Sequence, residues 1–219
     1  MVRRLIEESG SVPQHLSKIR TAYHEAGHAV VSRVVGAPLN VATIKPDEKR
    51  LGHVSYQSIQ HRRRQDVNEH WYVNIMVSMA GRASEEMVLG FLRPDGGDRT
   101  DRRHVRKFAN ILTGFKSDAL EIERKLRRCT TYTVENMKHS IKGVAEALLR
   151  SETLDQKRVD QIIAKSGELH KARRWIAWYW QARGLTPKRR RKPDAPKRRS
   201  SDQLARLPIS EEMRLAILY

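Results

Sequence analysis

The segment TAYHEAGHAVV, residues 21–31, constrains this chain more than any other stretch, because it places three chemically active side chains inside an apolar helix. Apolar residues recur at helical spacing along this stretch and on both sides of it, which predicts a helix over residues 12–35. Burying His24, Glu25 and His28 among apolar neighbours is costly unless each finds a partner. The segment therefore predicts a helix whose polar side chains meet a shared partner inside the domain.

The spacing of the two histidines favours a metal ion as that partner. Residues i and i+4 lie on one helical face about one turn apart, so the imidazoles of His24 and His28 can reach one ion. Neutral imidazoles suit a borderline metal such as zinc, which lowers the pKa of a bound water. Glu25 lies one step round the helix, where its carboxylate can take a proton from that water. The pattern H-E-x-x-H thus predicts one zinc ion and the hydrolysis of peptide bonds.

The motif leaves the third ligand open. In one class of zinc peptidases, a glycine and then a further histidine follow the second motif histidine at steps of three residues. Val31 and Val34 occupy those positions here, which excludes that class. A distant segment must therefore supply the third ligand.

The charge balance and the cysteine content restrict the setting in which the chain works. A net charge of +18 over 219 residues indicates an anionic partner, such as nucleic acid, an anionic membrane face or an acidic protein. The single cysteine, Cys129, excludes an internal disulfide and suits a reducing compartment. No apolar run reaches the roughly 18–20 residues that span a bilayer, and the first residues lack the apolar core of a signal peptide. We therefore expect a soluble, cytoplasmic protein.

Apolar periodicity predicts a mainly α-helical domain. After the first helix, we expect helices over residues 66–89, from about residue 100, over 117–149, and over 154–182 with a candidate break at Gly167. Short alternating runs at Val41–Thr43 and Val54–Tyr56 flank a turn and predict a small two-stranded β element.

The composition changes abruptly near residue 185. TPKRRRKPDAPKRRSS, residues 186–201, contains three prolines and no apolar residue larger than alanine, which is typical of a disordered basic linker. Residues 203–219 are compatible with a short amphipathic helix. We therefore expect a peptidase-like domain over residues 1–184 and a basic tail over 185–219. The tail is expected to attract a polyanion or nucleic acid electrostatically.

Aromatic residues gather just before this tail, among arginines. Trp175, Trp178, Tyr179 and Trp180 could stack on nucleic-acid bases. Their spacing instead marks one face of a helix, which favours packing onto the domain or onto a partner.

Several segments together resemble the peptidase domain of FtsH, the membrane-bound AAA zinc protease family. The resemblance covers about residues 16–164 and rests on five stretches: TAYHEAGHAVV; Pro38–Ile44 with Leu51-Gly52; MAGRASEE at 79–86, similar to the family's GGRAAEE; Gly97–Asp101, where the family has Gly-Ala-x-x-Asp; and Val144–Leu149 with Glu152–Leu154. It implies that His24, His28 and Asp101 bind zinc, while Glu25 acts as general base and then as proton donor to the leaving amine.

Other residues compete with Asp101 for the role of third ligand. Asp98 sits in a glycine-rich loop, where a cap of the following helix is the favoured role. His104 falls after that helix has begun. Glu85 and Glu86 are rivals as well, and either could instead accept a hydrogen bond from a ligand imidazole or lie solvated at a helix end. The sequence does not choose between these roles for the glutamate pair.

The chain also departs from the family pattern. Arg102 follows the expected ligand where the family usually has an aliphatic residue, and the sequence contains no G-x-x-x-x-G-K-[ST] phosphate loop and no membrane-spanning stretch. We therefore expect a metalloendopeptidase that works without ATP-driven unfolding of its own, on protein or peptide substrates, with a separate ATPase as a conceivable partner. The alternative is a basic nucleic-acid-associated or adaptor protein that retains the peptidase fold and acts by binding.

Overall fold

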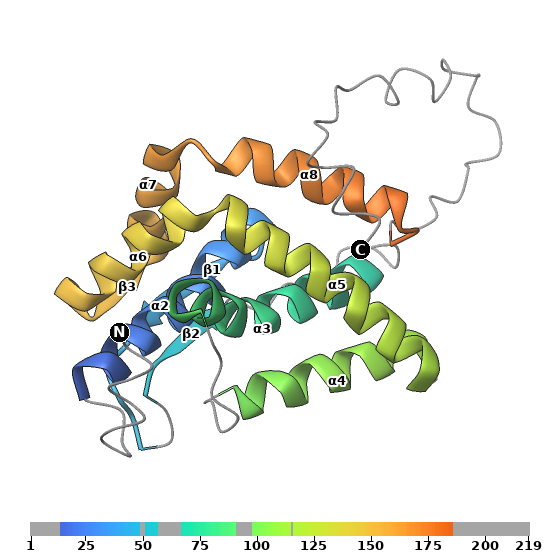
Figure 1. Cartoon of the computed structure of the whole chain (residues 1–219), viewed down its shortest axis with the longest axis horizontal. Helices are drawn as coiled ribbons and strands as arrows, with labels where there is room; N and C mark the ends of the chain where they lie inside the picture. Colours follow the sequence, from blue (N-terminus) through green and yellow to red (C-terminus); the bar gives the residue numbers. More distant parts are fainter. Residues whose placement is uncertain (1–13, 49–50, 57–66, 91–97, 115, 186–219) are drawn as a thin grey trace. The chain divides into compact units, whose positions relative to one another are not determined.

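The computed structural model describes residues 14–48, 51–56, 67–90, 98–114 and 116–185, and these form a mainly α-helical domain with one small sheet (Figure 1). The predicted fold class is confirmed. None of the helices in the described ranges is long and apolar enough to cross a membrane. The predicted basic tail and its terminal helix lie outside the described residues, as does the predicted start of the first helix at residues 12–13.

Helix α2 (Gln14–Val34) is the central element of the domain and packs against α3 (Val67–Leu89), α6 (Lys138–Ser151) and the sheet. Its second half is buried, as the apolar residues on all sides of it predict. A Cβ atom at Gly27 would lie 2.6 Å from the carbonyl oxygen of Ala80. The glycine therefore allows the two helix backbones to approach more closely than any other residue would permit.

The sheet contains three strands, one more than the alternating pattern predicts. Strands β1 (Leu39–Thr43) and β2 (His53–Tyr56) form the expected antiparallel pair. Strand β3 (Thr153–Asp155) pairs with the other edge of β1, so the order is β2-β1-β3. Three residues are too few to produce an alternating pattern, which is why the sequence predicted no strand here and began a helix at residue 154 instead. The edge of β2 that faces away from β1 is left without a neighbouring strand in the described sheet.

The long helix predicted over residues 117–149 is wrong, because the chain turns at Met137. Helices α5 (Lys116–Asn136) and α6 are separate. The carboxylate of Glu168 accepts hydrogen bonds from the backbone N–H groups of His139 and Ser140 at 3.2 and 2.9 Å. These donors belong to the first turn of α6, whose N–H groups have no partner within the helix. A residue 28 positions away therefore stabilises the break.

The last predicted helix is divided at Gly167, which takes a left-handed conformation with φ of 71°. Helix α7 (Gln156–Ser166) precedes this residue and α8 (Leu169–Ala182) follows it. Helix α5 lies between α8 and the pair formed by α3 and α4 (Arg99–Thr113; Figure 1). Trp175, Tyr179 and Trp180 are buried, and Trp175 stacks on Tyr132 of α5 with ring centroids 3.9 Å apart. The aromatic face of α8 thus packs onto the domain.

This packing gives a stability prediction. Replacing Trp175 by alanine should lower the free energy of unfolding by about 3–5 kcal/mol, the usual cost of removing a buried aromatic side chain. Trp178→Ala is the matched control, because its side chain is only half-buried and the expected loss is about 1 kcal/mol. Chemical denaturation of the two variants measures the difference. Equal losses would contradict the assignment of Trp175 to the core.

Candidate metal centre

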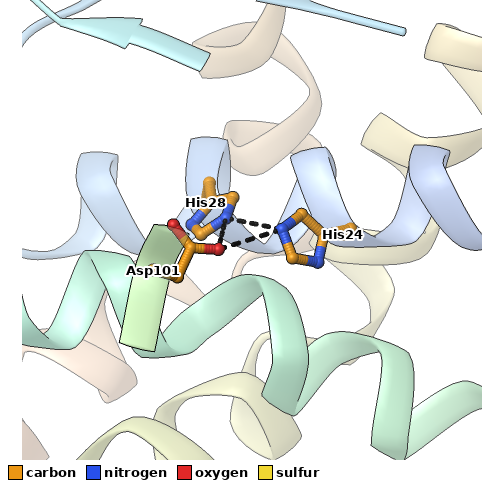
Figure 2. A group of neighbouring side chains, drawn as sticks. All are labelled: His24, His28 and Asp101. Carbon is orange, nitrogen blue, oxygen red and sulfur yellow. Dashed lines mark hydrogen bonds and ion pairs between the residues drawn. The ribbon is translucent and has the colours of Figure 1, made fainter. Parts of the chain in front are cut away.

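Three side chains that are far apart in the sequence converge on one point. His24 and His28 project from α2, and Asp101 projects from the first turn of α4 (Figure 2). The Nε2 atoms of the two histidines lie 3.0 Å apart. One carboxylate oxygen of Asp101, Oδ2, lies 3.2 Å from Nε2 of His24 and 3.3 Å from Nε2 of His28. The structure thus brings together the three residues that the FtsH resemblance implies as ligands.

The hydrogen bonds on the far side of each imidazole direct its lone pair toward this point. Nδ1 of His28 lies 2.7 Å from the carbonyl oxygen of Val77, which can only accept, so this nitrogen carries the proton. Nδ1 of His24 lies 2.6 Å from Oε1 of Glu85 and donates to that carboxylate. A neutral imidazole that donates through Nδ1 presents a lone pair at Nε2. With both imidazoles neutral, as metal binding requires, two nitrogen lone pairs and one carboxylate oxygen face one another.

This donor set fits zinc. A tetrahedral ion with bonds of about 2.0–2.1 Å to nitrogen and oxygen requires its ligand atoms to lie about 3.3 Å apart. The three measured separations are 3.0, 3.2 and 3.3 Å. Partners on the outer nitrogen of each histidine are also typical of zinc sites, because they fix the tautomer and the orientation of the ring.

The electrostatics of the cluster favour positive charge between the three side chains. Burial lowers the pKa of His24, but the hydrogen bonds to Asp101 and Glu85 outweigh it and raise that pKa to about 10. Burial raises the pKa of Asp101, but the neighbouring His28 and His24 hold it well below its usual range. A cation that occupies the same point would satisfy both effects.

Helix α3 packs against both imidazoles of the cluster at a glycine, Gly81. A Cβ atom at Gly81 would lie 2.5 Å from Nε2 of His28 and 2.7 Å from Nε2 of His24. These separations are shorter than any normal carbon contact, so only glycine allows both imidazoles to pack over the helix backbone at this level.

The beginning of α4 is anchored to α3 by a buried acid. Asp98 is 3% exposed, and its Oδ2 atom accepts a hydrogen bond of 2.6 Å from Nη1 of Arg82. Its Oδ1 atom lies 3.2 Å from Nε of Arg102, one turn along α4. Asp98 occupies the N-cap position but its side chain makes no capping hydrogen bond, so the role expected from the sequence is wrong. The two arginines draw the carboxylate away from the backbone and hold the turn that carries Asp101.

The other rivals for the third ligand position lie outside the cluster. His104 is exposed and stacks on Phe108 with ring centroids 5.7 Å apart. Glu86 is exposed, whereas Glu85 is 7% exposed and contacts His24. Glu85 also lies 3.1 Å from Nε of Arg20 through its second carboxylate oxygen. The structure therefore separates the two glutamates, although the sequence could not.

Sequence reasoning missed three contributors to the site: Arg20, Gly81 and the carbonyl of Val77. Arg20 lies four residues before His24 on α2, so its place on the same helical face was readable from the spacing. The carbonyl of Val77 has no sequence signal, because every residue carries a carbonyl group. Gly81 stands within the MAGRASEE segment, but its role depends on how closely α2 and α3 approach.

The cluster opens into a cleft of about 500 Å³ that also contains Glu25. The cleft is lined by residues of α2, β2, α3 and α4, and by Leu51 and Gly52 just before β2. Glu25 is 6% exposed, and burial raises its pKa, opposed by the nearby His28 and His24. A Cβ atom at Gly52 would lie 3.0 Å from Cγ of Glu25. The carboxylate thus lies in the same cleft as the candidate metal ligands, close to the segment that leads into β2.

Comparison with known proteins points to the same chemistry. Residues 11–115 match the model of Peptidase family M41. The chain resembles the zinc peptidase domain of the FtsH family. It is 32% identical over 181 residues to the ATP-dependent zinc metalloprotease YME1L1 of Rattus norvegicus, covering 70% of this chain and 25% of that protein. It is 27% identical over 192 residues to the ATP-dependent zinc metalloprotease FtsH of Neorickettsia risticii (strain Illinois), covering 72% and 30%.

These matches support a metalloprotease domain and also limit what can be transferred. The chain spans about a quarter of the length of the YME1L1 proteins from rat and human that it matches. The matched FtsH-like region contains His24, Glu25, His28 and Asp101. The sequence match to the family therefore includes the four residues of the candidate site.

The glycine beneath the cluster gives a prediction about metal affinity. Gly81→Ala should weaken zinc binding by about 10–100-fold, because the added methyl group displaces both imidazoles. Gly143→Ala, also within a helix, is the control, since its Cβ atom would meet only the side-chain atom Cγ2 of Ile162, at 2.8 Å. Zinc affinity is measured by competition with a chromogenic chelator. Unchanged affinity in Gly81→Ala would contradict the described packing of α3 against the histidines.

A second prediction tests the third ligand. Asp101→Ala should lose zinc affinity by at least about 100-fold, whereas His104→Ala should retain it. Asp98→Ala should weaken affinity by a smaller factor, about 10-fold, because it loosens the turn that carries Asp101 without removing a ligand. Zinc content by elemental analysis and circular dichroism of each variant separate ligand loss from unfolding. Full affinity in folded Asp101→Ala would assign the third ligand elsewhere.

Proposed function

We propose that this domain is a zinc-dependent metalloendopeptidase that hydrolyses peptide bonds. The observation that carries the proposal is the convergence of His24, His28 and Asp101 in a cleft that also holds the buried carboxylate of Glu25. The two histidines and the aspartate would hold one zinc ion. When bound, the ion would supply Lewis acidity and would lower the pKa of a water molecule toward neutrality.

The residues of the cleft divide the remaining work. Glu25 accepts the proton of the attacking water and then donates it to the leaving amine, and burial raises its pKa above the ordinary value of a glutamate. Glu85 holds His24 in the tautomer that presents Nε2, and Arg20 holds Glu85. The carbonyl of Val77 does the same for His28. The ligands are thus oriented before substrate binds.

We propose unfolded or flexible polypeptides as substrates, cleaved by this domain without ATP. The 219 residues contain no phosphate-binding loop, so cleavage by this domain alone is expected to need no ATP. The rival function is binding alone, with the basic tail attached to a polyanion or nucleic acid. The net charge of +18 favours that rival, whereas the retention of Glu25 beside the cluster favours the enzyme.

Replacement of the base tests the enzyme directly. Glu25→Gln should keep the fold and bind zinc as wild type does, while peptide cleavage falls by about 10²–10⁴-fold. The control is Glu86→Gln, which removes an exposed carboxylate from α3 and should cleave as wild type does. Casein and a quenched fluorescent peptide library are digested in the absence of ATP. Equal cleavage by Glu25→Gln and wild type would exclude this glutamate as the base.

Absence of cleavage in the zinc-loaded wild type, with casein and with the library, would instead favour the binding protein.

A further inference from the structure

Helix α4 carries an excess of positive charge on its solvent side. Among its 15 residues, five are arginine or lysine, and Asp101 is the single acid. Arg99, Arg102, Arg103, Arg106 and Lys107 are all exposed, whereas Val105 and Ala109 are buried. The acid is turned toward the two histidines. The exposed face of α4 is therefore cationic over its first three turns.

The positive charge is not neutralised by the surrounding protein. Arg102 lies near the carboxylate of Asp98, but Arg103, Arg106 and Lys107 form no ion pair with another residue in the ranges that the structure describes. Cations that lie within a few residues of one another repel. Binding of an anionic group to this face relieves that repulsion and lowers the free energy.

Part of this face borders the candidate active-site cleft. Thr100, His104 and Phe108 line the cleft and follow one another at steps of four residues, which makes them one row on the helix surface. A cation directly precedes each of them in the sequence: Arg99, Arg103 and Lys107. These three form the adjacent row, about 100° round the helix. Helix geometry therefore places Arg103 and Lys107 beside the row that lines the cleft, at its rim, and Arg106 on the far side of the helix from that row.

We propose that Arg103 and Lys107 bind an acidic segment of a polypeptide whose backbone lies in the cleft. This inference rests on the proposed function and deepens it, because it names the substrate class: flexible polypeptides with aspartate or glutamate a few residues from the bond that is cleaved. The preference arises from charge complementarity at the rim, whereas the metal centre and Glu25 act on the bond itself.

The net charge of each candidate partner determines whether it can bind to this face. The tail of this chain is strongly basic, and a second copy carries the same net charge of +18, so both are repelled. An anionic partner is required. The continuity of the cationic row with the cleft favours a polypeptide over nucleic acid, because the same chain that enters the cleft passes along the rim. Binding of nucleic acid is an outcome of the test.

The experiment compares two peptides that differ only in charge. One carries three glutamates next to the cleaved bond, and the other carries glutamines at the same positions. The full chain, zinc-loaded, is assayed for kcat and KM on both. The test variant is Arg103→Gln/Lys107→Gln, and the control is Arg106→Gln/Arg174→Gln, which removes the same charge from exposed positions away from the cleft rim.

Wild type should cleave the acidic peptide with a KM about 3–10-fold lower than that for the neutral peptide, as expected for two exposed ion pairs. The ratio should fall to about 1 in the test variant and persist in the control variant. It should also shrink between about 0.05 and 0.5 M salt, because these charges are screened. Two outcomes would overturn the inference and leave the proposed function standing. One is the same KM ratio of the two peptides in the test and control variants. The other is a wild type that cleaves both peptides with the same KM.

A binding assay tests this surface independently of the proposed peptidase activity. The Kd values of both peptides, fluorescently labelled, are measured by anisotropy with the Glu25→Gln variant, alone and combined with the two test substitutions. Tighter binding of the acidic peptide that disappears with Arg103→Gln/Lys107→Gln supports the surface even without cleavage. A duplex DNA oligonucleotide that binds more tightly than the acidic peptide, and loses affinity in the same variant, would assign the face to nucleic acid and refute the proposal.

Discussion

The close approach of α2 and α3 is the constraint on which the rest of the domain depends. Gly27 allows the backbone of α2 to rest on α3 near Ala80, and Gly81 allows the two imidazoles to lie over α3. These glycines act on the same contact from opposite sides. Without that proximity, Glu85 could not reach His24, and the carbonyl of Val77 could not reach His28. One backbone contact thus allows both histidines to be oriented by α3, which also lines the cleft.

The third member of the cluster comes from an element that is held in a different way. Helix α4 meets α3 through the buried carboxylate of Asp98, which lies between Arg82 and Arg102. Asp98 and Arg102 thus meet through an ion pair at the beginning of α4. Because the two side chains pair with each other, they fix the beginning of α4 together. They preserve the position of Asp101, and they also contribute charge to α4.

Acidic and basic side chains lie in different parts of the described domain: carboxylates inside the cleft, and cations on the outer face of α4. Inside the cleft, carboxylates stabilise positive charge between the histidines. Along the outer face of α4, Arg103, Arg106 and Lys107 form no ion pair within the described residues, whereas Arg102 pairs with Asp98. The aromatic residues of α8 lie mostly in the core, so the part of this helix that suggested base stacking stabilises the domain instead. The cationic face of α4 lies next to the cleft, which makes it the candidate surface for an anionic partner.

The sequence by itself determined the helical frame and the chemistry of α2, because local spacing encodes which side chains share a helical face. The H-E-x-x-H spacing, the apolar run around it and the glycine at 167 are all of this kind. The tertiary structure alone decided the break at Met137, the strand β3, the choice of Glu85 over Glu86 and the ion pairs of Asp98. Each of these depends on partners distant in sequence or on the geometry between helices: Glu168 caps α6 across 28 residues, and Glu85 meets His24 across 61. Periodicity within one element carries no information about such contacts.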